Sequence, residues 1–144
     1  MSSNNKVNIG LMQGRLSEPT EGFQETPKNW KREFGLLETL GLSHIDWVVT
    51  GKENPIFYED LTTYNINSIC ADNLIDKKIF DFDFLTDTLE PLCKSAAKNK
   101  IPSITIPLLE ESSVVDDDIR TEFIKSILRF VNKYPEIKFS FEAE

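Results

Sequence analysis

Short apolar runs, many of them rich in β-branched residues, alternate along this chain with longer segments in which apolar residues recur every three or four positions. Runs of the first kind are typical of β-strands buried on both faces, and segments of the second kind are typical of amphipathic helices. The alternation repeats four times, and a fifth apolar run follows. The pattern predicts an α/β fold in which successive βα units build a parallel sheet.

Five strands are expected, at "KVNIGLM" (6–12), "HIDWVVT" (44–50), "INSICAD" (66–72), "SITIPLL" (103–109) and "IKFSFEAE" (137–144). A long polar loop, "QGRLSEPTEGFQETPK", follows the first of them. Proline lacks the N–H that a strand donates to its neighbour, so we expect the sheet to loosen at Pro107.

The first two helices are predicted from their ends as well as from their apolar positions. One should begin after Asn29 as the N-cap and end at Gly41, which suits the left-handed conformation of a helix C-terminus. A weaker helix should run from Pro55 to Tyr64, with Asn65 in the left-handed conformation that ends it.

The last two helices carry longer apolar stripes. The third is expected to begin near Asp83 and to be kinked or split at Pro91, which removes a backbone donor. The fourth, "RTEFIKSILRFVNKY", has apolar residues at spacings of four, four and three. The run Asp116–Asp118 precedes it, where acids favour a helix N-terminus, so capping is the preferred interpretation over a metal site.

Composition and charge narrow the function classes. The chain is about one domain long at 144 residues, and its net charge of −8 argues against nucleic-acid and anionic-membrane partners. It contains no apolar run long enough for a signal peptide or a membrane span, so the cytoplasm is the expected location. Cys70, Cys93 and His44 are not spaced as a zinc site, and both cysteines are expected to be reduced core residues.

Six stretches in order along the chain carry a resemblance. They are "IGLMQGRLS", "NWKREFGLLETLGLSHIDW", "NPIF", "INSICAD", "ITIPLLEESS" and "FSFEAE". Together they resemble the sugar phosphate isomerase/epimerase family of the xylose isomerase-like barrel superfamily. The resemblance implies a (β/α)8 TIM barrel with its active site at the carboxyl ends of the strands. Residues 1–144 would then be the N-terminal portion of one barrel domain, about four βα units and a fifth strand.

The same resemblance implies a divalent metal, Mn, Mg or Zn. In the family a Glu at the end of the fifth strand binds the metal together with an Asp, a His and an acidic residue from strands six to eight. Glu142 matches the first of these and would be metal ligand and catalytic residue, whereas the others have no counterpart here. This chain alone is therefore expected to bind no metal and to be inactive. Glu144 lies past the matching position and is left unassigned, and a solvent-facing acid is the alternative interpretation of Glu142.

Four further residues are candidates for contact with a sugar or sugar phosphate. Gln13 and Arg15 follow the first strand, where Arg15 would bind a phosphate or else anchor the loop through a salt bridge. Asp46 would contact a ligand or make an internal hydrogen bond, and Asp72 would contact a substrate hydroxyl. His44 begins its strand, which places it at the wrong end for catalysis.

The function expected from these residues is proton transfer at a carbon next to a carbonyl, which isomerises or epimerises a sugar. A non-catalytic half-barrel that self-associates, or binds a partner, through open sheet edges is the alternative. A barrel endonuclease acting on abasic DNA is disfavoured by the acidic charge. Trp47 is expected to pack between strand and helix rather than to stack on a sugar.

Overall fold

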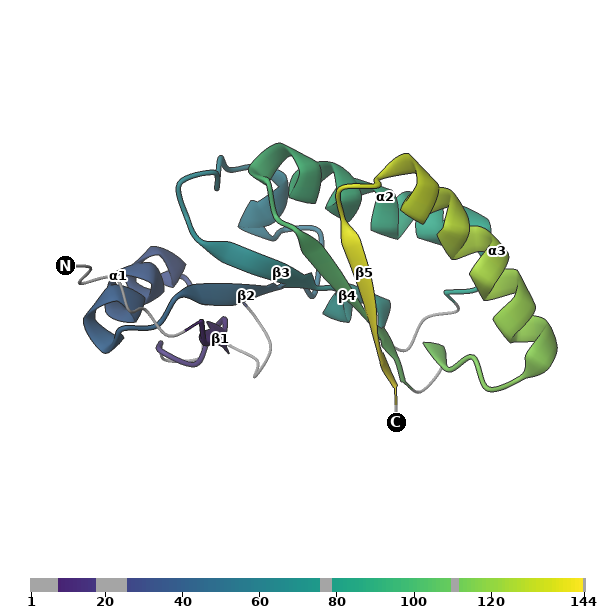
Figure 1. The fold of residues 1–144 in the computed structure, drawn as a ribbon, viewed down its shortest axis with the longest axis horizontal. Coiled ribbons are helices and arrows are strands. Elements are labelled where there is room, and N and C mark those ends of the chain that lie inside the picture. The colour runs from purple at the N-terminus through teal and green to yellow at the C-terminus, as the bar shows by residue number, and fades with distance from the viewer. Residues whose placement is uncertain (1–7, 18–25, 76–78, 110–111, 144) are drawn as a thin grey trace.

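The computed structural model describes residues 8–17, 26–75, 79–109 and 112–143 (Figure 1). One parallel sheet of five strands runs through them in the order β1-β2-β3-β4-β5. The strands are β1 (Gly10–Met12), β2 (His44–Val48), β3 (Ile66–Cys70), β4 (Ser103–Leu108) and β5 (Lys138–Ala143). The helices are α1 (Trp30–Leu40), α2 (Phe82–Asn99) and α3 (Asp117–Lys133), with short 3-10 turns η1 (Pro55–Phe57) and η2 (Asp72–Leu74).

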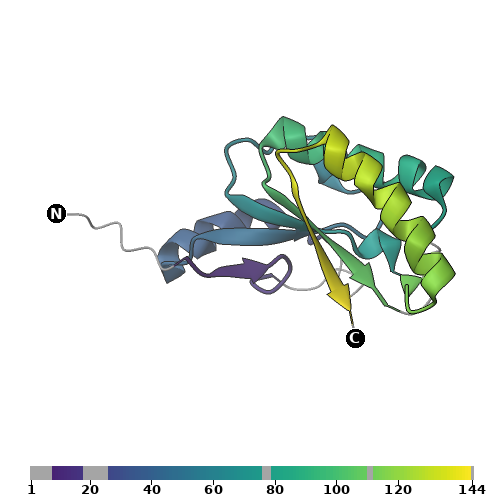
Figure 2. The same ribbon diagram turned by 45° about the vertical axis from the view of Figure 1, so that its right-hand side comes forward.

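The predicted α/β class is confirmed, and its strands lie side by side in the order of the sequence. Parallel strands in sequential order are joined by crossovers that all progress in one direction across the sheet. Such crossovers place their helices on the same face, and Figures 1 and 2 show α2 and α3 together on one side of the sheet. All carboxyl ends of the strands therefore meet at one edge, which we call the carboxyl edge.

The hydrophobic core lies between the sheet and the three helices. Trp47, Ile69 and Ile104 alternate with polar neighbours along β2, β3 and β4, and all three are fully buried. Trp30 of α1 packs edge-on against Trp47, with ring centroids 5.1 Å apart. The expected packing role of Trp47 is thus confirmed, and α1 contributes to the same core as α2 and α3.

The opposite face of the sheet carries small and polar side chains. Strand register places Asp46 beside Ser68 on the neighbouring strand, and it places Cys70 beside Thr105 and Thr105 beside Ser140. No helix covers this face within the part of the chain that the structure describes (Figure 2). We call it the open face.

Two of the expected helices are confirmed with their ends. Helix α1 begins directly after Asn29, although the Asn29 side chain makes no capping bond, and Gly41 has the predicted left-handed φ of 72°. Helix α3 is capped by the Asp116 carboxylate, which accepts hydrogen bonds from the backbone N–H groups of Asp118 and Ile119 at 2.9 and 3.1 Å. Capping is therefore what Asp116 does in this structure.

The expected helix from Pro55 to Tyr64 is wrong, because only the 3-10 turn η1 forms there. The N–H of Leu61 donates to the Oδ1 of Asn99 in α2, at 2.9 Å, instead of continuing a helix. The Asp60 carboxylate meanwhile accepts from the backbone and hydroxyl of Thr62, a local turn that competes with helix formation.

Of two smaller expectations about these segments, the left-handed conformation of Asn65 is wrong, and of a kink or a split at Pro91 only the split is contradicted. Asn65 is not left-handed, since Lys100 is the one non-glycine residue with positive φ among those described, and the Asn65 amide donates instead to the carbonyl of Ser43. Helix α2 is capped by Asp81 and continues through Pro91 without being split.

The fourth strand does not loosen at Pro107. Its pairing with β5 continues from Ser103 through Pro107, which lies opposite Glu142. The carbonyl of Thr105 accepts a hydrogen bond from the N–H of Ala71 at 2.9 Å. The backbone groups of every second residue of β4, Thr105 and Pro107 among them, are therefore directed toward the β3 side. Because β3 ends at Cys70, Pro107 lies beyond that strand and loses no ladder bond to it.

Candidate functional site

The loop after β1 is held by a buried acid on α1 that sequence reasoning missed. Glu33 is fully buried, and its carboxylate accepts hydrogen bonds from the N–H of Gly14 at 3.0 and 3.1 Å and from the N–H of Leu16 at 2.9 Å. Gly14 has a φ of 89°, which suits glycine at this turn. The available signal was the position of Glu33 on the apolar stripe of Trp30 and Leu37.

Gln13 directly follows β1 and hydrogen-bonds to β2 with both its backbone and its side chain. Its backbone N–H donates to Asp46 at 2.9 Å, and its Oε1 accepts from the N–H of Val48 and from the hydroxyl of Thr26, both at 3.1 Å. The residue is 1% exposed, and its Nε2 makes no hydrogen bond within the described residues. Gln13 therefore has a clear positioning role, and contact with a substrate remains a prediction.

Arg15 is exposed on the same loop, and its guanidinium donates to the sulfur of Met12 at 3.7 Å. Glu33 anchors this loop through the two neighbours Gly14 and Leu16, and an anchoring salt bridge of Arg15 itself also stays a prediction. Phosphate binding by Arg15 stays a prediction.

Asp46 lies on the open face, half-buried. Burial raises the pKa of the Asp46 carboxyl, and the nearby His44 opposes this in part. Its Oδ1 is buried and has no hydrogen-bond partner among the residues that the structure describes. Of the two expected roles, an internal hydrogen bond from this atom is not observed there.

Three acids act electrostatically on one thiol, Cys70, at the end of β3. Burial first, and then the charges of Asp46, Asp72 and Glu142 in that order, raise the pKa of Cys70 to about 12. Asp72 lies two residues after the end of β3, at the start of η2, and Glu142 lies on β5. Each of the three predicted acids therefore lies within electrostatic range of Cys70.

Asp72 and Glu142 also interact with each other. Burial raises the pKa of Asp72 first, and the Glu142 carboxylate raises it further. Glu142 itself is exposed. The pair thus consists of one acid that holds its proton more tightly than usual and one acid that is open to solvent.

A depression of about 450 Å³ lies on the open face, and Asp46 is the one of these three acids that lines it. The residues that line it also include Ser68, Thr105, Ser140 and Lys138. Hydroxyls, a carboxylate and an ammonium group can all exchange hydrogen bonds with a polyhydroxylated molecule.

The acids present do not complete a metal site. Within the described ranges, no three His, Cys, Asp or Glu side chains are placed to hold one ion. Glu142 and Asp72 could serve as two oxygen ligands, whereas the burial that keeps the Cys70 thiol protonated makes it a poor third. Glu144 lies outside the described residues.

The sequence also contains a histidine and two cysteines that were considered for chemistry. His44 is the first residue of β2, as expected, and therefore lies at the amino end of its strand. Cys70 and Cys93 are both free thiols, and burial raises the pKa of Cys93 to about 12 as well. No helix in the described ranges is both long and apolar enough to cross a membrane.

Comparison with protein-family models finds no match for this sequence, and comparison with curated proteins and with solved structures finds no significant match. A function is therefore inferred from the sheet order and from the interaction of Asp72 with Glu142.

Proposed function

We propose that this chain forms part of a sugar or sugar phosphate isomerase or epimerase of the (β/α)8-barrel type, with its site at the carboxyl edge. The observation that carries the proposal is the pairing of Asp72 with Glu142, which lie at the carboxyl ends of β3 and β5. Asp46 lies on the open face and lines the polar depression there. Acids gathered at the carboxyl ends of parallel strands are where barrel enzymes carry out their chemistry.

The sheet supports the barrel type. Five parallel strands in sequential order with helices on one face form the arrangement that a (β/α)8 barrel repeats around its axis. Doubly wound folds reverse their strand order at a switch point, and the described sheet has no such reversal. The open face would then line the interior of the barrel.

The acid pair supports proton transfer. A carboxyl group whose pKa is raised keeps its proton to a higher pH than usual and can deliver it to a substrate oxygen, whereas an exposed carboxylate can accept a proton from carbon. Asp72 has the raised pKa, and Glu142 is the exposed partner. In this proposal Glu142 is the base and Asp72 holds a substrate hydroxyl or carbonyl oxygen.

A divalent metal would supply polarisation of the substrate oxygens, with Glu142 as one ligand. The described residues do not provide a full set of metal ligands. The proposal therefore requires further ligands besides Glu142.

Binding of a sugar phosphate tests the proposal directly. Fructose 6-phosphate added to the ¹⁵N-labelled chain should shift the amide resonances of Gly14, Asp72 and Glu142 together, at concentrations on the order of 1–10 mM. Glu142→Gln should weaken this binding, and Glu136→Gln, which alters an exposed acid beside the end of α3, should not. Shifts that are confined to other surfaces, or equal in both variants, would contradict the proposal.

A half-barrel that associates through its sheet edges is the second candidate. Strands β1 and β5 are the outer strands of the described sheet, and Phe141 on β5 is 43% exposed. Its ring meets Phe123 edge-on with centroids 5.6 Å apart and leaves its other side uncovered. An exposed apolar edge strand favours association. Light scattering should show an oligomer that Phe141→Glu dissociates, and a monomeric wild-type chain would exclude this candidate.

A further inference from the structure

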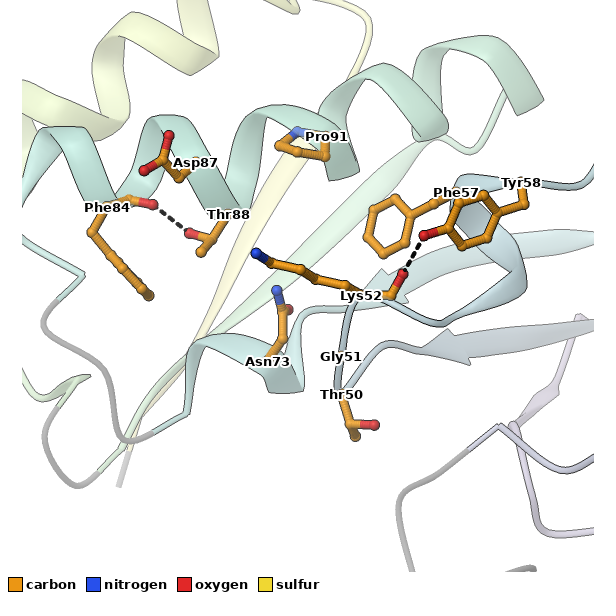
Figure 3. Close-up of a pocket in the computed structure, with 10 residues that line it drawn as sticks. All are labelled: Thr50, Gly51, Lys52, Phe57, Tyr58, Asn73, Phe84, Asp87, Thr88 and Pro91. Atoms are coloured by element: carbon orange, nitrogen blue, oxygen red, sulfur yellow. Dashed lines mark hydrogen bonds between the residues drawn. The ribbon is translucent and has the colours of Figure 1, made fainter.

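A second cavity, away from the open face, lies between η1, η2 and helix α2 (Figure 3). Its volume is about 430 Å³, within the range of cavities that bind small molecules. The segment after β2 supplies one wall, η2 supplies the floor with Asn73, and α2 supplies the opposite wall. None of the predicted site residues lines it.

The walls of this cavity are mainly apolar and aromatic. Phe57 from η1 and Phe84 and Pro91 from α2 present rings to it (Figure 3). Tyr58 lies at the rim, where its hydroxyl donates to the carbonyl of Lys52 at 2.9 Å. Flat apolar surfaces on two sides of a cavity favour a ligand with a ring or a compact apolar body.

One cationic group points into the cavity. The side chain of Lys52 extends toward α2, and Asn73 lines the same cavity (Figure 3). Asp87 also lines the cavity, but its carboxylate points away from Lys52 (Figure 3). An ammonium group beside an amide N–H is a suitable partner for a carboxylate, since both groups donate hydrogen bonds.

One buried acceptor in the walls lacks a donor within the described residues, and a second has lost its usual helical donor. The Oδ1 of Asn73 is buried and has no hydrogen-bond partner within the described residues. Pro91 has no N–H, so it cannot donate to the carbonyl of Asp87 as a helix would require. The ammonium group of Lys52 has three N–H donors, enough to serve such an acceptor and a carboxylate together.

The walls are held in place before any ligand binds. Asn54 uses both ends of its amide: Oδ1 accepts from Trp47 and Ile56 at 2.7 and 3.0 Å, and Nδ2 donates to Thr26 and Val48, both at 2.8 Å. This fixes the start of η1, which carries Phe57. A cavity formed in advance costs less conformational entropy on binding.

The N–H of Asn73 donates to the carbonyl of Val49 at 2.8 Å, which fixes the floor of the cavity. From these contacts we propose that the cavity between η1 and α2 binds a small monocarboxylic acid with an aromatic body. The carboxylate lies against Lys52 and Asn73, and the ring lies between Phe57 and Phe84. None of the acids Asp46, Asp72 and Glu142 lines this cavity, so the binding proposal is independent of the isomerase proposal.

Four small molecules test this site by NMR on the ¹⁵N-labelled chain. Three carry the same phenyl ring and differ in charge, and the fourth has the carboxylate without the ring. Phenylacetate should shift the amides of Lys52, Phe57 and Asn73 with a dissociation constant on the order of 1 mM. 2-Phenylethanol, which has the ring without the charge, phenethylamine, which has the opposite charge, and acetate, which has no ring, should each bind at least about fivefold more weakly.

Lys52→Met should weaken phenylacetate binding about tenfold or more, because the variant keeps the chain length and loses the charge. Lys52→Arg should restore most of the affinity. The matched control, Lys125→Met on α3, lies on an exposed helix surface and should leave it unchanged. Equal binding of phenethylamine, unchanged affinity in Lys52→Met, or shifts outside the cavity would each overturn the proposal.

Discussion

The carboxylate of Glu142 on β5 raises the pKa of Asp72, which follows β3, and adds to the larger effect of burial at Asp72. The two acids are distant in sequence and meet because β3, β4 and β5 lie side by side with their carboxyl ends together. The interaction links the geometry of the sheet to a chemical property that can be measured.

Replacing Asp72 should make stability less dependent on pH. Because its pKa is raised in the folded state, the folded chain binds this proton more tightly than the unfolded chain does. Stability from this group is therefore present below the ordinary pKa and is lost as the pH rises through the raised value. Asp72→Asn should gain about 0.5 kcal/mol relative to wild type between pH 3 and pH 7, after allowance for solvent screening.

Urea denaturation at the two pH values measures this difference. Asp87→Asn, which alters an exposed acid on α2, should show no such gain. A wild-type advantage that grows with pH would have the wrong sign for a raised pKa.

Removing the Glu33 carboxylate should destabilise the chain strongly. Glu33→Ala leaves the N–H groups of Gly14 and Leu16 without their acceptor and opens space in the core, at a cost of about 2–4 kcal/mol. Glu38→Ala on the exposed side of the same helix should change stability by less than about 0.5 kcal/mol. Equal unfolding midpoints for the two variants would show that Glu33 does not anchor the loop.

Asn54 should be one of the least replaceable polar residues. Asn54→Ala removes the acceptor for the Trp47 indole and the donor to the Val48 carbonyl, with an expected loss of about 2–3 kcal/mol. Asn132→Ala on the exposed surface of α3 serves as the control and should be near neutral. Tryptophan fluorescence during denaturation follows the Trp47 environment, and an unaltered transition in Asn54→Ala would refute this role.

Arg15 should distinguish phosphorylated from unphosphorylated sugars. Arg15→Ala should weaken binding of fructose 6-phosphate by roughly 1.5–3 kcal/mol, the contribution of a charge-assisted hydrogen bond, and should leave binding of fructose unchanged. Calorimetric or NMR titration gives both affinities. The same affinity for the phosphate ester in both proteins would remove Arg15 from the site.

Local sequence was sufficient for features that depend on local chemistry. Gly41 takes the predicted left-handed conformation, and Asp116 caps α3, because each acts on backbone groups only a few residues away. Asp72 and Glu142 lie at the same edge because both follow or end parallel strands, and the carboxyl ends of parallel strands lie at one edge of a sheet whatever the path of the connecting helices.

Features that depend on distant partners were missed. The segment from Pro55 to Tyr64 has a helical pattern, yet the N–H of Leu61 bonds to Asn99, a contact that only the packed α2 provides. Glu33 was overlooked because an acid on an apolar stripe has meaning only when the loop at Gly14 lies against it. The cavity beside Lys52 likewise combines three segments that no single sequence pattern connects.

The proposed function depends above all on Asp72 and Glu142 sharing one site, and a pH titration of the Asp72 carboxyl carbon by NMR measures this directly. In the wild-type chain Asp72 should titrate above its ordinary value of 3.8, and Glu142→Gln should lower that pKa while burial keeps it raised. Glu136→Gln, the control, should leave the titration of Asp72 unchanged. An Asp72 pKa at or below 3.8, or one that is the same in wild type and Glu142→Gln, would contradict a shared site at the carboxyl edge.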